Sequence, residues 1–510
     1  MEPQPKQTHL PMVLLALALT LLLSSLDGTI TSTAMPTVIR ELSGLELYAW
    51  VFTTYMLTTT AVMPIVGKMS DLYGRKRFYL GGLALFMVGS GLCGTAHTMT
   101  ELILYRGLQG LGAGAITPIT FTLLYSLLPA DQGAKLGAVF GGVFGLSSLI
   151  GPNLGAYITE HFSWRWCFYI NLPLGIAAFV ILVFALHETR SSHRPSIDYL
   201  GSVTMVATTV CLMLAMKFAG DQGSWLGWKV VSLLSASLAS FGLFLFAERR
   251  AQEPILPLEL FKNRVVLGTC ATTFAQGAVM FGAIAYLPLF VVGVLGLNTG
   301  DAGNVLTPLM FTVIAAAMLA APLFERIAYR SYMAISMAIM AVAAYMISVA
   351  PFTASKWQMM GLMVALGAGI GMMMSVAQLA VSQSVEERHM GISASLVGFF
   401  RSIGGVLGTS LMATIVNAET HQQIASGLGK LGAGSARLQA AGSPQALMAM
   451  GKQLPEEVHA FLVTVLGNAI HHAFVFPIAI ALLGLAATTV MGSERFVRSA
   501  LKEPPRPVEA

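Results

Sequence analysis

A single carboxylate, Asp27, stands in the first apolar run of the sequence, where no other charged residue occurs between His9 and Arg40. An ionised carboxylate at bilayer depth costs about 2.5–3.5 kcal/mol on insertion scales, so such a residue usually faces a protein interior or a water-filled cavity. Membrane proteins keep acids at this depth where a proton or a cation must be bound. Asp27 is therefore the first candidate for reversible protonation.

Arg106 is a second charged residue inside an apolar run, in the segment LILYRGLQGLGAGA at residues 102–115. Steps of three and four residues place Arg106 and Gln109 on one helical stripe. A buried guanidinium stays charged and needs an acidic or carbonyl partner. Asp27 is the only acid deep in the amino-terminal apolar runs, so we expect Arg106 to pair with it directly or through water. The alternative is that Arg106 only braces helix ends or backbone carbonyls.

The composition indicates that these residues are held by helices in a bilayer. Of the 510 residues, 55% are hydrophobic and only 10% are charged, whereas a soluble domain has about 25% charged residues. The mean hydropathy is +0.72, which indicates a polytopic helical membrane protein. Apolar windows of about 20 residues, the length that crosses a bilayer, lie near 11–32, 48–67, 78–97, 101–125, 135–159, 165–186, 198–217, 228–247, 266–294, 303–322, 332–350, 357–381, 392–416 and 467–491. These windows predict an all-α integral membrane protein with about fourteen spans.

The charges and the missing motifs narrow the class of protein. Most of the 29 Lys and Arg residues fall on the side of the N-terminus, so the positive-inside rule predicts a multi-pass protein of the bacterial inner (plasma) membrane with both termini in the cytoplasm. The first apolar run is too long for a signal peptide, and we interpret it as an uncleaved span. The four cysteines lack metal-ligand spacing, and no Arg-rich pattern indicates nucleic-acid binding. The sequence contains neither HExxH nor GxxxxGK[ST]. It therefore favours a transporter over an enzyme, and a transporter that is not driven by ATP.

The loop after the second span reads GKMSDLYGRKR, residues 67–77. Its glycines permit tight turns and close helix approach. A carboxylate beside guanidinium groups can form an ion pair in one conformation and break it in another. The alternative is an ordinary basic cytoplasmic loop. The residues expected to gate the conformational change are Gly67, Asp71, Gly74, Arg75, Lys76 and Arg77.

The fifth span carries a stripe of small residues. Small side chains on one face let a neighbouring backbone come close, and a proline can kink the helix. This pattern is typical of a packing face, and it also suits a surface on which two halves slide. The residues of this expected antiporter-type helix are Gly141, Gly145, Gly151, Pro152 and Gly155.

Together these segments resemble a known family. GKMSDLYGRKR resembles the loop signature of the major facilitator superfamily, and LILYRGLQGLGAGA resembles its fourth-helix arginine motif. GGVFGLSSLIGPNLGA, residues 141–156, resembles the fifth-helix motif of its antiporters, although Ala156 replaces the second glycine of the terminal pair. Segments that resemble the fourteen-spanner drug:proton antiporters are LDGTITSTAMP (26–36), WRWCFYINLPLG (164–175), EPILPLELFKNR (253–264) and FRSIGGVLGTS (399–409).

The resemblance implies a fold and a driving force. We expect two six-helix bundles, 1–190 and 253–510, joined by two additional transmembrane helices at 191–252. We also expect a long outer loop near 417–466, with a flexible Gly/Ala-rich part and then an amphipathic surface helix. In this family the acid of the LDxT segment takes part in proton coupling or contacts cationic substrates. Asp27 and Arg106 are thus the expected proton-coupling residues, and the proton gradient replaces any cofactor.

The expected function is a proton-coupled multidrug efflux antiporter that exports amphipathic hydrophobic or cationic compounds by alternating access and so confers antibiotic resistance. The alternative is a dedicated proton-coupled exporter of an endogenous lipid, fatty acid or metabolite, because Arg401 adds positive charge where the final six spans show no clear mid-membrane acid. Methionine-rich spans would give a pliable cavity. The expected partners are small molecules, protons and the bilayer; we expect a monomer, with a periplasmic adaptor in a Gram-negative envelope. The candidate cavity residues are Asp27, Gln109, Gln378 and Arg401.

Overall fold

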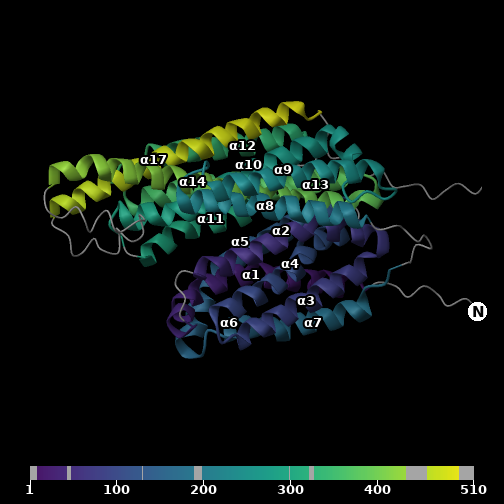
Figure 1. Ribbon diagram of the computed structural model, residues 1–510. Coiled ribbons are helices and arrows are strands. Elements are labelled where there is room, and N and C mark those ends of the chain that lie inside the picture. The colour runs from purple at the N-terminus through teal and green to yellow at the C-terminus, as the bar shows by residue number, and fades with distance from the viewer. Residues whose placement is uncertain are drawn as a thin grey trace, which may run out of the picture.

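Helices make up the architecture of the chain. The computed structural model describes residues 9–42, 47–128, 130–188, 198–297, 299–320, 327–431 and 456–492 (Figure 1). In these ranges, twelve helical segments are long and apolar enough to cross a membrane. The helices α5 and α11, of 32 and 22 residues, raise the number of long helical segments to fourteen. The prediction of an all-α membrane protein is confirmed.

The helices follow one another along the chain in three groups. The first group is α1 (Leu10–Leu42), α2 (Tyr48–Tyr73), α3 (Arg75–Thr95), α4 (Met99–Leu127), α5 (Ala130–His161), α6 (Trp166–Tyr169) and α7 (Asn171–Ala185). Two helices come next, α8 (Tyr199–Gln222) and α9 (Trp228–Arg250). The last group is α10 (Arg264–Gly293), α11 (Thr299–Ala320), α12 (Tyr329–Ser348), α13 (Lys356–Ser384), α14 (Met390–Leu431) and α17 (Glu456–Ala487). Single 3₁₀ turns occur at Leu258–Lys262, Glu387–His389 and Thr488–Val490.

Polar residues at the starts of several helices explain where they begin. The side chain of Thr98 accepts a hydrogen bond from the backbone N–H of Glu101 at the start of α4, and Ser355 forms a reciprocal capping box with Gln358 at the start of α13. At the start of α10, the side chain of Asn263 accepts hydrogen bonds from the backbone N–H groups of Val265 and Val266. Such caps satisfy backbone donors that the first turn of a helix leaves free.

Separate apolar cores lie in the two groups of helices. A cluster that includes Leu17, Phe86 and Ile119 fills the space among α1, α3 and α4, and another that includes Met363 and Phe474 fills the space among α10, α12, α13, α14 and α17. In Figure 1 the first group, purple to blue, lies below the second, teal to yellow. We call them the amino-terminal and carboxyl-terminal bundles. The chain begins at the right of Figure 1, α1 runs from there to the left, and α2 returns to the right. The right-hand end, where α2 finishes just after Asp71, is named the Asp71 end, and the opposite end is named the far end.

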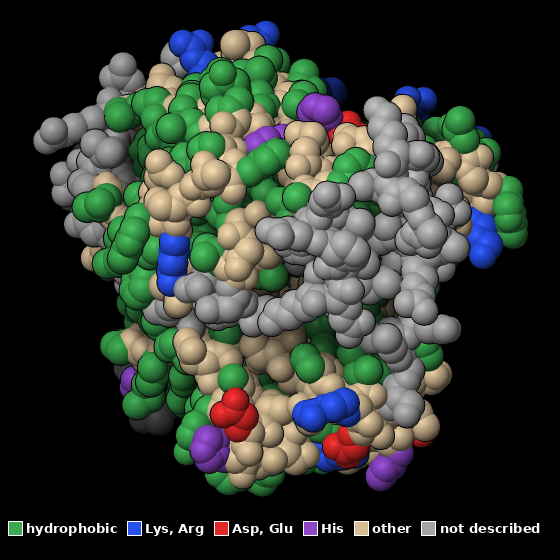
Figure 2. Space-filling view, turned by 90° about the vertical axis from the view of Figure 1, so that its left-hand side faces the viewer, with side chains coloured by type: hydrophobic (Ala, Val, Ile, Leu, Met, Phe, Trp, Pro, Cys, Tyr) green, Lys and Arg blue, Asp and Glu red, His purple; other side chains and the backbone are tan. Residues whose placement is uncertain are grey.

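The outer surface of the helices is apolar. Figure 2 views the far end, where hydrophobic side chains extend over the flanks and charged ones are sparse. Large side chains such as Leu104, Phe184 and Trp357 are more than half exposed. A soluble protein rarely exposes a contiguous apolar surface of this kind, whereas a bilayer solvates it.

Glycines let α4 lie unusually close to both of its neighbours. On one side, a Cβ atom at Gly89 of α3 would lie 2.6 Å from the backbone of Gln109. On the other side, a Cβ atom at Gly110 would lie 2.6 Å from the carbonyl oxygen of Tyr55 in α2. Close backbone approach at small residues is the usual way in which membrane helices pack. The glycine-rich segment 102–115 therefore lets α2 and α3 pack closely against α4 on either side of Arg106.

The helix α8 lies against helices of both bundles. Near the far end, the side-chain amide of Asn417 in α14 donates a hydrogen bond of 3.1 Å to the carbonyl oxygen of Gly220, and Thr414 donates one of 3.2 Å to that of Ala219. On the opposite face, Phe218 packs edge-on against Trp50 of α2. Figure 1 shows α8 between α2 and the carboxyl-terminal bundle.

The prediction of a long outer loop near 417–466 is wrong at both ends of that range. The helix α14 continues to Leu431, and α17 begins at Glu456; residues 432–455, the rest of that expected loop, lie outside the described residues. The glycines at 427 and 429 sit in a helix whose turns before them are held by packing against α8 and α17. The segment expected as a separate surface helix is instead the first part of α17 and runs unbroken into the last span.

The close contact of α3 with α4 predicts different outcomes for two neighbouring glycines. Gly89→Val should destabilise the folded protein by about 1–3 kcal/mol, the usual cost of overpacking, because the new side chain meets the backbone of Gln109. Gly91→Val on the same helix is the matched control, since its nearest neighbour is a flexible Leu172 side chain at 3.9 Å. Thermal unfolding of the two purified variants in detergent measures the difference, and equal melting temperatures would contradict this account of the interface.

Candidate functional site

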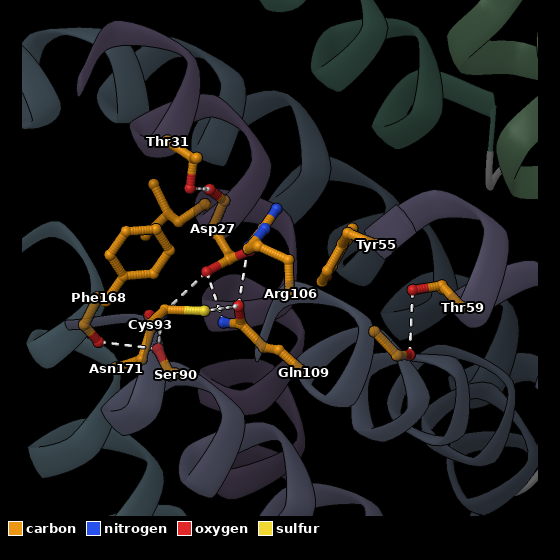
Figure 3. Close-up of polar contacts among 12 residues, drawn as sticks. Asp27, Thr31, Tyr55, Thr59, Ser90, Cys93, Arg106, Gln109, Phe168 and Asn171 are labelled. Carbon is orange, nitrogen blue, oxygen red and sulfur yellow. Dashed lines mark hydrogen bonds and ion pairs between the residues drawn. The ribbon is translucent and has the colours of Figure 1, made fainter. Parts of the chain in front are cut away.

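Asp27 and Arg106 form an ion pair in the core of the amino-terminal bundle. The guanidinium Nη1 of Arg106 donates to the Oδ2 of Asp27, and both side chains have an exposed fraction of 0%. The side-chain amide of Gln109 donates to the Oδ1 of Asp27 over 2.7 Å. The Oε1 of the same amide accepts from Nη1 of Arg106 over 2.8 Å. Figure 3 shows the three side chains meeting at one point between α1 and α4.

A second amide, that of Asn171 at the start of α7, completes the shell of the carboxylate. Its Nδ2 donates to the Oδ1 of Asp27 over 3.1 Å and to the hydroxyl of Ser90 over 3.0 Å. Ser90 in turn donates to the carbonyl oxygen of Phe168 over 2.9 Å. Each carboxylate oxygen therefore has a donor, which is the condition under which a charge can stay buried.

The guanidinium of Arg106 uses only part of its donor capacity. Its carbon lies 4.1 Å from the centre of the Tyr55 ring and 5.9 Å from that of Phe168. Among the described residues, its Nε and Nη2 atoms have no hydrogen-bond partner although both are buried. A guanidinium offers five N–H donors, so three of them are in reserve.

The charge of Asp27 determines whether this arrangement is electrically balanced. While Asp27 is ionised, the charges of the pair cancel, and two amides solvate the carboxylate. When a proton binds to Asp27, the positive charge of Arg106 loses its counter-ion inside a core of low dielectric, which is costly. Protonation therefore favours any rearrangement that gives Arg106 water or another acceptor.

The structure brings some predicted site residues together and adds others. The predicted pairing of Asp27 with Arg106, and the placement of Gln109 beside them, agree with these contacts. Asn171 and Tyr55 were missed, because an amide or a tyrosine in an apolar run carries no signal of its own until its neighbours are known. Cys93 was treated only as a cysteine without metal spacing, yet its thiol lies 3.7 Å from the Oε1 of Gln109.

At the Asp71 end, hydrogen bonds of Asp71 connect the amino-terminal bundle to the carboxyl-terminal bundle. Its carboxylate oxygens accept hydrogen bonds of 3.0 Å from the backbone N–H groups of Gly391 and Ile392, in the first turn of α14. Free N–H groups and the helix dipole make such a turn a good partner for a carboxylate. Arg75 lies 3.6 Å from Asp71 and donates to the carbonyl oxygen of Glu387 over 3.1 Å. This group, which we call the latch, ties α2 and α3 to the carboxyl-terminal bundle.

The glycines and the other basic residues of the loop have distinct roles. A Cβ atom at Gly67 would lie 2.6 Å from the hydroxyl oxygen of Ser395, so the glycine lets α2 touch α14. Gly74 has φ +104°, which side chains other than hydrogen rarely allow. Lys76 donates to the carbonyl oxygen of Val183 over 2.8 Å, within the amino-terminal bundle. Arg77 is exposed, and no described residue pairs with it.

The glycines of α5 face α1 where their surroundings are described. A side chain at Gly151 would collide with Thr29, and a Cβ atom at Gly155 would lie 2.9 Å from the carbonyl oxygen of Ile30. Pro152 sits inside the same helix without ending it. Gly141 and Gly145 also belong to α5, but their surroundings lie outside what the structure describes. The described part of this stripe packs within the amino-terminal bundle, two to six residues along α1 from Asp27.

The remaining cavity candidates lie in the carboxyl-terminal bundle, away from Asp27. Gln378 of α13 is 2% exposed, and its amide donates to the carbonyl oxygen of Ala394 over 3.4 Å. Arg401 is a partly exposed residue of α14, and its backbone touches α10 at Gly277. Several of the methionines expected to line a cavity, Met359, Met363 and Met373 among them, are instead fully buried in the core of that bundle.

The latch makes a testable statement about the closure of the Asp71 end. In a variant without native cysteines, Ser395→Cys places a thiol at a buried position between α2 and α14. Adding Asp71→Asn should speed maleimide labelling of that thiol by about 10- to 100-fold, because hydrogen bonds to a charged group contribute about 1.5–3 kcal/mol. Asp221→Asn, which removes an exposed carboxylate of α8 at the far end, is the control. An unchanged labelling rate with Asp71→Asn would show that the latch does not hold this end closed.

Comparisons with known proteins agree with the fold. A sequence model of the Major Facilitator Superfamily matches residues 17–409. The chain is 36% identical over 420 residues to the Multidrug transporter protein MdtP of Bacillus subtilis (strain 168), covering 82% of this chain and 78% of that protein. It is 35% identical over 491 residues to Multidrug resistance protein 3 of the same organism, covering 95% of each. The crystal structure of the human organic anion transporter MFSD10 (TETRAN) has the same fold, with a TM-score of 0.61 at 12% identity over 93% of this chain and 100% of that chain. The chain belongs to the major facilitator superfamily and is a transporter of that family.

Proposed function

We propose that this transporter is a proton-coupled antiporter that exports amphipathic hydrophobic or cationic compounds by alternating access. The observation that carries the proposal is the buried Asp27–Arg106 pair with its two amide donors. A purely structural ion pair would be replaceable by apolar packing at little cost. A pair that must change its charge needs both an acid and a shell that tolerates two states, and the amides of Gln109 and Asn171 provide that shell.

The latch gives the proposed cycle its direction. The positive-inside rule favours the Asp71 end as the cytoplasmic one, so the conformation described here is closed toward the cytoplasm by the Asp71 and Arg75 contacts. In the proposed cycle, release of the substrate to the outside and binding of a proton from outside to Asp27 are two halves of one turnover. The neutralised carboxylate then releases Arg106, and the latch opens as the bundles 1–190 and 253–510 rock about the site in the plasma membrane.

Two observations bear on the substrate. Relatives are named for multidrug transport, which supports a broad set of amphipathic compounds. In the carboxyl-terminal bundle, Arg401 lies on α14, the helix that packs across the interface against α2 and α4. A guanidinium there favours an anionic head group, so an endogenous fatty acid or another acidic lipid is the second candidate substrate.

Asp27→Asn tests the proposed coupling. The variant keeps the shape of the side chain but cannot bind and release a proton. In proteoliposomes loaded with ethidium, the stimulation of transport by a pH gradient should fall by about 5- to 150-fold, the range of a typical coupling free energy. Glu160→Gln, which neutralises an exposed carboxylate near the end of α5, should leave the stimulation unchanged. Full gradient-driven transport by Asp27→Asn would sink the proposal.

A parallel measurement separates the two substrate classes. In wild-type proteoliposomes, transport of ethidium, an aromatic monocation, is compared with transport of oleate, an anionic lipid, under the same pH gradient. Export of ethidium supports the multidrug function, and export of oleate alone supports the dedicated lipid exporter.

A further inference from the structure

Tyr55 of α2 is the partly exposed member of an otherwise buried site. Asp27, Arg106, Gln109 and Asn171 each have an exposed fraction of 1% or less. Tyr55, whose ring lies under the guanidinium at 4.1 Å, retains contact with the outside of the bundle. In Figure 3 it stands between Arg106 and the ribbons of the carboxyl-terminal bundle. The shortest way from the space between the bundles to the ion pair therefore passes this ring.

The backbone of Tyr55 is held in place by contacts with α4. Its carbonyl oxygen lies against Gly110 of α4, where a Cβ atom would come within 2.6 Å. One turn further, Thr59 donates a hydrogen bond of 3.0 Å to the carbonyl oxygen of Gly110. Movement of the whole helix would break these contacts. Rotation of the Tyr55 side chain would break its contact with Arg106, a hydrogen bond of its hydroxyl with Ser24 and part of its packing against the core of the amino-terminal bundle.

The donors that Arg106 holds in reserve show what would enter when the ring turns. Its Nε and Nη2 atoms are buried and lack a hydrogen-bond partner among the described residues. Leaving such donors unsatisfied is costly, and water is the usual partner of buried polar groups that protein does not satisfy. Water admitted past Tyr55 would bind these N–H groups and reach the carboxylate of Asp27, which shares Nη1 of the same guanidinium.

We propose that Tyr55 is a shutter, by which we mean that the orientation of its ring decides whether water from the space between the bundles reaches the proton site. This inference rests on the proposed function. With the ring over Arg106, the site is dry and the proton stays where it is. An amphipathic cation between the bundles offers the ring a competing contact, and the ring turns away from the guanidinium. A hydronium ion then gives its proton to a carboxylate oxygen of Asp27 and remains as water. Tyr55 is thus a positioning residue whose loss uncouples the proton from the substrate.

Tyr55→Leu tests the shutter through a proton leak that needs no substrate. Proteoliposomes with a pH-sensitive dye inside receive a pH gradient, with potassium and valinomycin holding the membrane potential at zero. In the wild type, proton entry should depend on added ethidium. In Tyr55→Leu, proton entry without ethidium should rise by about 30-fold, which corresponds to the roughly 2 kcal/mol of a desolvated cation–π contact. The double variant Asp27→Asn with Tyr55→Leu should return the leak to the wild-type rate.

Matched variants separate the shutter from a general defect. Tyr55→Phe keeps the ring and should keep the leak within about twofold of the wild-type rate, because the aromatic face over Arg106 remains. Tyr125→Leu removes another partly buried tyrosine, stacked on Phe121 of α4 and about 28 Å along the helix from Arg106; it should not leak. If Tyr55→Leu fails to fold, Tyr55→Met removes the same aromatic face with less change in volume.

The outcomes distinguish this inference from the function on which it rests. A folded Tyr55→Leu or Tyr55→Met that does not leak would overturn the shutter, and so would a leak that persists in the double variant with Asp27→Asn. Neither result touches the assignment of Asp27, which is read from the loss of gradient-driven transport in the single Asp27→Asn variant. If that single variant keeps its coupling, the proposed function and the shutter fall together.

Discussion

The structure of the amino-terminal bundle depends on one constraint: two opposite charges must remain buried, with every other demand on their surroundings met. Removing one partner of a buried pair typically costs about 3–5 kcal/mol, so Asp27 and Arg106 dictate what may lie near them. They require the amides of Gln109 and Asn171. These amides in turn require that α3, α4 and α7 come within hydrogen-bond reach of α1. The glycines of α3 and α4 let these two helices come close together, as at Gly89, where a Cβ atom would meet the backbone of Gln109.

The two bundles solve the problem of a membrane core in different ways. The amino-terminal bundle contains a polar centre, whereas the carboxyl-terminal bundle is filled with methionines and aliphatic side chains, including the fully buried Met337, Met340 and Met363. An ion pair held by four directional hydrogen bonds has one good geometry, while thioether side chains repack at small cost. The amino-terminal bundle therefore holds the ion pair in one geometry, and the carboxyl-terminal bundle is able to repack when that geometry changes.

Much of this architecture could be predicted from the sequence, for physical reasons that also mark the limits. The pairing of Asp27 with Arg106 was predictable because a buried charge leaves few choices of partner. Asn171 was not, since an amide can be satisfied by any carbonyl. The expected loop at 417–466 was wrong at its ends because Gly and Ala signal flexibility in isolation, yet α14 remains helical to Leu431. Gln378 lies in the carboxyl-terminal bundle, as its position in the sequence predicted, whereas its hydrogen bond to the carbonyl oxygen of Ala394 could not be read from the sequence.

The position of α8 determines which body it moves with. It is held to α14 by two hydrogen bonds to its backbone carbonyl oxygens and by the close packing of Gly220. To α2 it is held by the ring of Trp50, which contacts Phe218 and Lys217 near the molecular surface. Such an exposed aromatic contact contributes about 0.5–1 kcal/mol, so it yields first when the bundles separate at the far end. In the proposed cycle, α8 would therefore move with the carboxyl-terminal bundle, and the two moving bodies would part at Trp50.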